Sequence, residues 1–568
     1  MPAHPAVPAN TPPQQDFVLR QLKITHWPGL TGSPFAPDPL LGRTPLNLNR
    51  LGALLAQHPK PTKVKKFLNY LQFGHPLLCS SPPSTRWSHN LASATSNPQA
   101  ALAKIEKEVK LGRVRGPFRN ISDTGLPSLV ISPIGLIPKA EGGFRLIHHL
   151  SHPWGRGINA FISDEDAHVS YARFDDAILF LTISGPNTLM AKVDVQSAYR
   201  LLPMRPSDHK YLGFQFLGQV YYDLMLPMGA KISAAHWEDF GNLWEWLISY
   251  HTNFQGNMCR YLDDLLLEFP PHLSLNQAQE SLAEVLSLCS DIGLPLSKEK
   301  LVNPTTQLTF LGIAIDSTNQ TLAIPTPKLL KAKHLIEIAI AKRKVQVHRI
   351  LSIAGLLNFL CKALPPGRPF LRRLFDSVAG KHKRQWITLE PGCLSDLKTW
   401  LAFLEHFNGT TPFPPTVTLR ASDIHLYTDA SLTGYGIICG THWVAETFPT
   451  PNQCPHSMTW REFYPILVAT FTFPSQLSHK KICFVTDNLG VFHILRSLTS
   501  RAPDIMELVR PFVLQCLKMN TTFTSKYVPS ARNSLADPLS RQEFQIFRSR
   551  APWADTTPTP IPHHLKLS

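Results

Sequence analysis

The sequence predicts an α+β protein of several domains, and three observations lead to this prediction. With 568 residues and 43% hydrophobic content, the chain has room for about three to five packed domains. Apolar segments expected to form strands end at the acids Asp194, Asp263, Asp429 and Asp487. Other segments carry apolar residues at helical spacing, so helices are expected beside the strands.

The N-terminal part is expected to contain little regular structure before the first long helix. Residues 1–45 are rich in proline and lack periodicity, which predicts an extended or disordered arm. Short helices are expected over residues 46–100. Within residues 99–111, Leu102, Ile105 and Val109 are separated by charged residues, which predicts an amphipathic helix.

The tetrapeptide 261–264, Tyr-Leu-Asp-Asp, is the most informative stretch of the sequence. Asp263 and Asp264 lie between an apolar lead-in and three leucines, where a buried hairpin is expected. Buried ionised carboxylates need a cationic partner, and a divalent metal is the commonest one. Asp194 ends another apolar strand, so two adjacent strands could bring Asp194 and Asp263 together for two-metal phosphoryl transfer. A solvated hairpin tip is the simpler alternative.

After Pro325 and Pro327 the pattern changes to helices. Apolar residues recur at helical spacing over 329–340 and again over 350–360. Lysines such as Lys331 and Lys333 lie among them, and a solvated helix face explains these as well as a grip on nucleic acid does.

A further α/β pattern begins after the prolines at 412–415. Residues 424–431 form an apolar strand that ends at Asp429, and glycines lead into a second strand at 434–438. Glu462 lies in a predicted helix that begins at Trp460, Asp487 ends the strand 482–486, and Asp537 lies in the segment expected to open the last helix. Each acid alone could be an ordinary helix cap or strand end.

Six blocks in this order resemble reverse transcriptases. They are residues 133–147, the Asp194 strand, Leu226-Pro227-Met228-Gly229, the 261–264 tetrapeptide, 293–300 and 310–313. The resemblance implies a right-hand polymerase, with fingers and palm over residues 101–325 and a helical thumb or connection over 326–415. It also implies RNA-directed DNA synthesis from an RNA template, a DNA primer and deoxynucleoside triphosphates.

The resemblance assigns roles at the polymerase site. Asp194, Asp263 and the backbone carbonyl of Val195 would hold the metals, and Asp264 would have a lesser or structural part. The remaining roles concern the nucleotide. Lys139 and Arg145 would hold the phosphates, Tyr199 would exclude a 2′-hydroxyl, Met228 and Gly229 would lie near the nucleotide, and Lys300 would act as a general acid, with Lys298 as its competitor. For Tyr199, a packed core tyrosine is the alternative.

Residues 416–545 resemble ribonuclease H, an α/β fold, and residues 546–568 are expected to form a tail. Asp429, Glu462, Asp487 and Asp537 match the metal-binding quartet of that family. Oxygen ligands suit Mg²⁺, with Mn²⁺ possible, and two ions per active site are implied. The histidine that many members carry before the last acid is missing, and Arg532 or Ser530 could substitute. Cleavage of the RNA strand of an RNA–DNA hybrid is therefore expected.

Composition limits the class of protein. Lys and Arg exceed Asp and Glu by 56 to 40, a net charge of +16, which suits a protein that neutralises nucleic-acid phosphates. Nine cysteines without a C-x-x-C spacing indicate neither a zinc ribbon nor a disulfide framework. No leader-like or membrane-spanning apolar run is present, so an intracellular protein of the cytoplasm or nucleus, not secreted and without a membrane partner, is expected.

Three further patterns in the sequence bear on its function. Asp123-Thr124-Gly125 spells the triplet of retroviral proteases, but no protease-sized domain surrounds it. His148, His149 and His152 have metal-ligand spacing without a nearby cysteine or acid, so a structural role is expected. Residues 112–118 and 145–151 are most similar to retrotransposons of the DIRS type, which move with a tyrosine recombinase. Integration is therefore expected to need a separate recombinase or integrase. The rival readings are an inactive nucleic-acid-binding scaffold and a structural particle protein.

Overall fold

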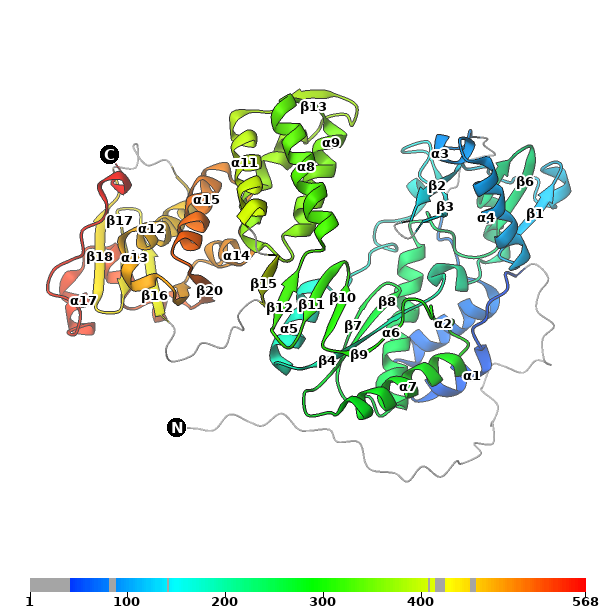
Figure 1. Cartoon of the computed structure of the whole chain (residues 1–568), viewed down its shortest axis with the longest axis horizontal. Helices are drawn as coiled ribbons and strands as arrows, with labels where there is room; N and C mark the ends of the chain where they lie inside the picture. Colours follow the sequence, from blue (N-terminus) through cyan, green and yellow to red (C-terminus); the bar gives the residue numbers. More distant parts are fainter. Residues whose placement is uncertain are drawn as a thin grey trace.

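The computed structural model describes residues 41–80, 88–139, 142–406, 409–413, 424–449 and 456–567. Most of the predicted N-terminal arm and the expected domain boundary at 416 lie outside these ranges. Figure 1 shows a large α/β part that contains α1 to α7, a helical part above and beside it, and a second α/β part near the C-terminus. The mixture of helices and mostly antiparallel sheets confirms the predicted α+β class.

An antiparallel sheet in the order β7-β8-β4-β9, here called the central sheet, carries the first acids. Its strands are β4 (Leu189–Asp194), β7 (Asn257–Tyr261), β8 (Asp264–Phe269) and β9 (Val302–Thr305). Successive leucines of β8 point to opposite faces. Leu265 and Leu267 share a core with α6 (Ser233–His251) and α7 (Leu275–Asp291), whereas Leu266 packs with α5 (Phe174–Ser184). Helices thus cover both faces, which explains why three leucines, 265–267, follow one another in β8.

The N-terminal helices pack against this core. Helix α1 (Leu48–Leu54) and helix α2 (Pro61–Phe73) contribute Leu51 and Phe67 to the core that contains α6. The helix predicted over 99–111 is confirmed as α4 (Pro98–Lys110), which follows the short α3 (Ala92–Thr95). Near it lie two small sheets. They are the hairpin β2 (Ile134–Pro138) and β3 (Phe144–His148), and the sheet β1 (Val114–Phe118), β6 (Gln219–Asp223) and β5 (Gly213–Phe216).

The segment after the central sheet forms a small sheet and then a helical region, as the sequence predicts. The helices are α8 (Thr326–Lys342), α9 (Val347–Leu360), α10 (Arg372–Val378) and α11 (Pro391–His406), with a two-stranded antiparallel sheet of β13 (Lys344–Gln346) and β14 (Trp386–Thr388). The small sheet has the order β10 (Gln307–Phe310), β11 (Ile313–Asp316), β12 (Thr321–Ala323) and β15 (Thr410–Pro412). The chain therefore returns to this sheet after α11.

The C-terminal part contains a five-stranded sheet, here called the C-terminal sheet, in the order β18-β17-β16-β19-β20. The strands are β16 (Ile424–Ala430), β17 (Gly434–Cys439), β18 (His442–Thr447), β19 (Lys481–Thr486) and β20 (Thr522–Tyr527), and β19 runs parallel to both of its neighbours. Its helices are α12 (Met458–Thr472), α13 (Pro474–Leu477), α14 (Leu489–Ser497), α15 (Pro503–Lys518), α16 (Ala536–Ser540) and α17 (Phe544–Arg550).

One expectation for this part needs correction. The segment that carries Asp537 forms the short helix α16, which is not the last helix because α17 follows it. The residues after α17 also pack against the sheet: the Trp443 indole donates to the Asp555 carbonyl at 2.7 Å, and the Ile561 side chain is buried in the core. Apolar residues in this segment therefore find partners on the C-terminal sheet.

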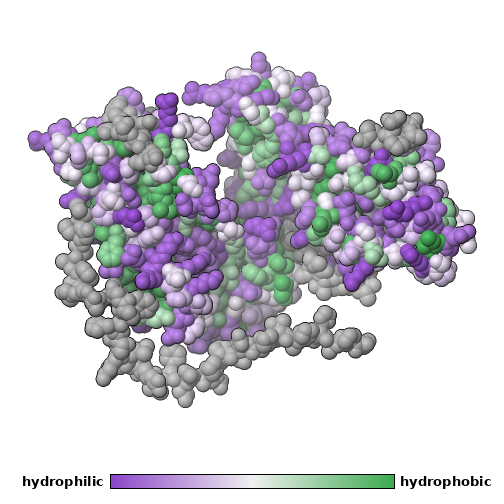
Figure 2. Space-filling model, turned by 180° about the vertical axis from the view of Figure 1, so that it is seen from behind, coloured by the Kyte–Doolittle hydropathy of each residue, from purple (hydrophilic) through white to green (hydrophobic). Residues whose placement is uncertain are grey.

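Figure 2 shows the molecule hollowed between two lobes, one bearing the β2–β3 hairpin and α4 and the other bearing α8 and α9. Hydrophilic residues cover much of the surface around this hollow (Figure 2). Among the helices in the described part of the chain, none combines the length and the apolar character needed to cross a bilayer.

Candidate active sites

The first acidic site lies where β4 ends and where β7 turns into β8. Asp194 is the last residue of β4 and pairs with Asp264, the first residue of β8, while Asp263 occupies the turn. The Val195 N–H donates to the Asp263 carbonyl at 2.9 Å. Leu262 has a φ of 58°, a left-handed conformation that apolar residues rarely adopt. The Trp237 indole of α6 donates to the Leu262 carbonyl at 3.0 Å and so stabilises this conformation of the turn.

Two lysines neutralise the carboxylates of this site. The Lys300 ammonium donates to Asp194 Oδ2 at 3.0 Å, and the Lys192 ammonium lies 3.9 Å from Asp264 Oδ1. Burial raises the pKa of Asp264 to about 6, with Lys192 opposing the shift. Burial, and then the charge of Asp194, also raise the pKa of Asp263. Carboxylates that resist ionisation in this way are a donor set to which a divalent cation would bind favourably.

A cavity of about 470 Å³ joins this site to the β2–β3 hairpin. Its lining includes Asp194 and Asp263 at one end and Lys139 and Arg145 from the hairpin. Lys300 also lines it and Lys298 does not, so the geometry favours Lys300 over its competitor. The structure further adds Lys104 and Lys107 of α4. Sequence reasoning missed these two because they read as the solvated face of an amphipathic helix.

A second cavity of about 490 Å³ adjoins the turn at residues 262–263, here called the Asp263 turn, and is lined by Tyr199, Met228, Gly229 and Asp263. The Tyr199 side chain is half-buried and meets the Trp237 ring edge-on, with the ring centroids 6.4 Å apart. Burial raises its pKa, so the hydroxyl stays neutral. At Gly229 the φ is +135°, and a Cβ would lie 1.9 Å from the His148 carbonyl oxygen. The close approach that requires glycine is therefore to the backbone of β3.

A buried polar network forms part of the wall of the 470 Å³ cavity. The Arg200 guanidinium contacts Asp223 at 2.6 Å and Glu108 at 2.9 Å, and His148 Nδ1 lies 2.9 Å from Asp223. His148 Nε2 lies 3.1 Å from the Gly213 carbonyl, so both ring nitrogens have protein partners. This agrees with the structural role expected for His148, and the network links the hairpin to the segment that carries Tyr199.

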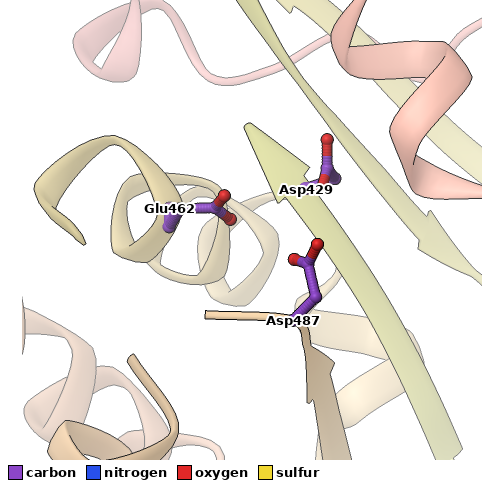
Figure 3. A group of neighbouring side chains, drawn as sticks. All are labelled: Asp429, Glu462 and Asp487. Atoms are coloured by element: carbon purple, nitrogen blue, oxygen red, sulfur yellow. The ribbon is translucent and has the colours of Figure 1, made fainter. Parts of the chain in front are cut away.

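The second acidic site lies at one end of the C-terminal sheet. Asp429 is near the end of β16, Asp487 directly follows β19, and Glu462 comes from the first turns of α12. Figure 3 shows Glu462 pointing toward the strand ends that carry the two aspartates. One carboxylate oxygen from each residue lies within 4.8 Å of the others. Among the described residues, this is the group of three His, Cys, Asp or Glu side chains whose ligand atoms lie this close together.

The electrostatics of this trio favour a cation. Burial, and then the charges of Asp429 and Asp487, raise the pKa of Glu462 to about 9. Burial raises the pKa of Asp429 to about 6. Glu462 Oε2 and Asp487 Oδ1 are buried without a hydrogen-bond partner among the residues that the structure describes. Unpaired buried oxygens are costly, and a divalent ion with oxygen ligands would satisfy both.

The fourth predicted ligand is not part of this trio. The Asp537 carboxylate accepts from the Arg541 guanidinium at 2.9 Å, although its charge acts on Asp429. Asp429 has two partners that sequence reasoning missed: the Ser540 hydroxyl at 2.5 Å and the Asn533 amide at 3.3 Å. Ser540 follows Asp537 by three residues on α16, so helical spacing from the predicted acid could have identified it.

Comparison with known proteins is consistent with the first site. Residues 137–315 match the family model described as reverse transcriptase (RNA-dependent DNA polymerase). Over 458 residues, 78% of the chain, it is 22% identical to the Transposon Tf2-3 polyprotein of Schizosaccharomyces pombe and 21% identical to the Tf2-7 polyprotein. The chain spans about a third of the length of these relatives, 31%.

Solved structures of a foamy viral protease-reverse transcriptase are also similar. The form named dRH in complex with ds DNA has a TM-score of 0.47 and 15% identity, and covers 87% of this chain and 84% of that one. The complex with RNA/DNA hybrid has a TM-score of 0.36 and 13% identity, and covers 87% and 85%. The family match includes the Asp194 strand, the Asp263 turn and Lys300. The chain therefore contains a reverse transcriptase domain over residues 137–315.

Proposed function

We propose that the chain is an RNA-directed DNA polymerase with a second, ribonuclease H activity, encoded by a retrotransposon. The observation that carries the polymerase half is a single cavity in which Asp194 and Asp263 face Lys139, Arg145 and Lys300. Acids to hold cations and bases to hold phosphates are the two requirements of phosphoryl transfer. The partners would be an RNA template, a DNA primer and deoxynucleoside triphosphates.

At the polymerase site, Asp194, Asp263 and the Val195 carbonyl would hold two Mg²⁺ ions, with Mn²⁺ as a substitute. Such ions activate the primer 3′-hydroxyl and neutralise the triphosphate. Arg145 can bind a phosphate with two parallel hydrogen bonds and Lys139 as a point charge. Lys300 neutralises Asp194 in the absence of substrate and lies where it can donate a proton to the leaving pyrophosphate. Tyr199 excludes ribose, and Asp264 is held back by Lys192.

At the second site, Asp429, Glu462 and Asp487 would hold the cations for cleavage of the RNA strand in an RNA–DNA hybrid. Their mutual spacing within 4.8 Å and their raised pKa values support this. Asp537 joins them in the proposal if it releases Arg541, which is exposed and free to move toward a phosphate. Ser540 and Asn533 orient Asp429 by hydrogen bonds.

The element is proposed to be of the DIRS type, on the wording of residues 112–118 and 145–151. Under this proposal a separate recombinase would integrate the DNA product, and the protein would act inside the cell. The resemblance to Tf2 polyproteins supports a retrotransposon of some type without choosing this subgroup.

Two single substitutions test both activities. Asp263→Asn should abolish primer extension on an RNA template, because a cation ligand is lost, while a preformed hybrid is still cut. Asp487→Asn should reduce hybrid cleavage by orders of magnitude and leave extension intact. Asp291→Asn and Asp504→Asn are matched controls, since both acids are exposed in ion pairs. If neither activity is present in the folded wild-type protein, a non-catalytic nucleic-acid-binding scaffold replaces the proposal.

A further inference from the structure

A pocket lies between α2 and α6, away from both acidic sites, with a volume of about 460 Å³. His236, Asp239, Leu243 and Trp246 of α6 line it, and their spacing places them along one side of the helix. Trp237, whose indole donates a hydrogen bond to the Asp263 turn, is not among the lining residues. Helix α6 therefore supports the polymerase site with one side and forms the wall of a separate pocket with another.

The rim of this pocket is basic. Lys60, Lys63 and Lys66 line it and are exposed to solvent. Asp239, the acid that lines it, lies 3.9 Å from Lys66 and offsets one of these charges. The remaining positive charge favours a ligand with phosphates, and three lysines at the start of α2 can follow an extended backbone rather than a single anion.

The walls of the pocket are aromatic. Trp246 is half-buried, meets the His58 ring edge-on at 4.7 Å and stacks on Tyr250 at 4.6 Å. Tyr250 is 56% exposed, so the stack continues from the pocket to the surface. Tyr70 forms another part of the wall. Exposed aromatic rings beside lysines are the arrangement on which proteins stack unpaired bases.

His75, which lines the pocket, carries a buried hydrogen-bond acceptor without a partner among the residues that the structure describes. His75 is 1% exposed, and its Nδ1 lies 3.2 Å from the Pro203 carbonyl, which can only accept, so Nδ1 carries the proton. Burial lowers the pKa of His75 well below its usual value, so the ring is neutral and Nε2 keeps a lone pair. Nε2 is buried without a hydrogen-bond partner in the part of the chain that the structure describes. An N–H of a base edge would satisfy it.

We propose that this pocket binds a nucleotide of a single-stranded nucleic acid, with the base between the aromatic walls and the backbone along the lysines. Lysines alone would suit any polyanion, and aromatic rings alone would suit an apolar peptide. The two together with an unpaired acceptor on a lining residue suit a base attached to a phosphate backbone. The site goes beyond the proposed function, and its test needs no enzymatic activity.

The test is binding of a fluorescent single-stranded oligoadenylate of about 12 nucleotides, measured by anisotropy with an excess of unlabelled primer–template duplex. Lys60→Gln with Lys63→Gln should weaken binding about tenfold and lower the slope of log affinity against log salt by roughly 1.4, which is 0.7 for each lost contact. Lys480→Gln with Lys518→Gln removes two exposed lysines elsewhere and should change neither quantity.

Stacking is tested separately. Trp246→Ala should weaken binding at least about fivefold, whereas Trp246→Phe, which keeps a ring, should restore most of it. Primer extension or the circular dichroism spectrum shows that each variant is folded. A photoreactive base in the oligonucleotide should crosslink to residues 58–75 or 236–250 in the wild type. The inference would be overturned by equal binding in all variants or by crosslinks confined to other regions. It would also be overturned if the protein bound free adenosine monophosphate but did not bind the oligonucleotide.

Discussion

At the scale of single residues, Tyr199 is the residue that we expect to select the sugar of the nucleotide. Its half-buried ring packs against Trp237. It also lines the 490 Å³ cavity, together with Asp263. Tyr199→Val removes the bulk that meets a 2′-hydroxyl, so ribonucleotide incorporation should rise at least about tenfold relative to deoxyribonucleotides, which corresponds to ~1.4 kcal/mol. Single-nucleotide extension measures this ratio. Tyr199→Phe keeps the ring and should keep the discrimination; an unchanged ratio in the valine variant would make Tyr199 a packing residue.

A second residue-scale prediction concerns Glu268 of β8, whose side chain is 1% exposed. Burial raises its pKa from 4.5 to about 9, with Asn257 opposing the shift. The folded state thus holds a proton that the unfolded chain releases near its ordinary pKa. Stability from this group is full at low pH and is lost as the pH rises toward 9. Glu268→Gln mimics the protonated form and should remove this loss.

The measurement is the free energy of unfolding of both proteins in urea at several pH values. The two should be close at about pH 5, and the Gln variant should be more stable on the order of 1–3 kcal/mol at about pH 9. Glu299→Gln, a change of an exposed acid, should give no such divergence. Parallel stability curves for wild type and the Glu268 variant would contradict the argument.

The sequence predicted the acids of both sites more readily than their partners. An acid that interrupts an apolar strand is conspicuous, so Asp194, Asp263, Asp429 and Asp487 could be identified. Lys300 was expected at the site only by resemblance, and its contact with Asp194, which lies 106 positions away in the sequence, depends on the packing of β9 beside β4. The placement of Asp537 was also beyond the pattern, because its contact with Arg541 depends on side-chain geometry within α16.

At the scale of elements, α6 is the helix that stabilises the Asp263 turn. The Trp237 indole donates to the carbonyl of Leu262, whose left-handed φ would otherwise be poorly stabilised. Trp237→Phe keeps a ring and loses the hydrogen bond, which typically contributes about 0.5–1.5 kcal/mol. The primer-extension rate should therefore fall roughly three- to tenfold while hybrid cleavage is unchanged.

The same helix provides a control for this prediction. Trp244 is also fully buried, but its indole donates to the Cys289 sulfur at 3.3 Å, away from the turn. Trp244→Phe should cost stability without a selective loss of extension. Equal effects of the two substitutions on extension would show that α6 acts through stability alone.

Helical periodicity predicted long elements well and short ones poorly. Helix α4 and the helices over 329–340 and 350–360 were expected, because apolar residues repeat over several turns. The segment after Asp194, in contrast, forms only a 3₁₀ turn, Ala198–Leu201, which is too short for apolar residues to repeat at helical spacing. The return of β15 to β12 was not predictable either, since three residues carry too little pattern to define a strand.

At the scale of the whole molecule, the helical region and the C-terminal part meet around one buried acid. Asp396 of α11 is 1% exposed and contacts Arg373 of α10 at 3.1 Å and Arg510 of α15 at 3.3 Å. Leu514 of α15 also packs against the core of the helical region. Because Arg510 belongs to the C-terminal part, this contact fixes that part against the helical region.

The last prediction is that Asp396→Asn loosens this contact. The substitution leaves Arg373 and Arg510 close together without a negative partner, and breaking a buried pair in this way costs about 3 kcal/mol. Asp376→Asn is the matched control, since its pair with Arg372 is exposed and should be worth less than about 1 kcal/mol. Thermal unfolding should shift clearly for Asp396→Asn alone.

If the proposed activities are present, a fixed contact also sets the spacing between the two active sites along a bound hybrid. RNA cleavage positions, measured from the primer 3′ end, should then spread in Asp396→Asn and stay sharp in the control. A sharp pattern in both variants would mean that the bound hybrid, and not this contact, sets the spacing.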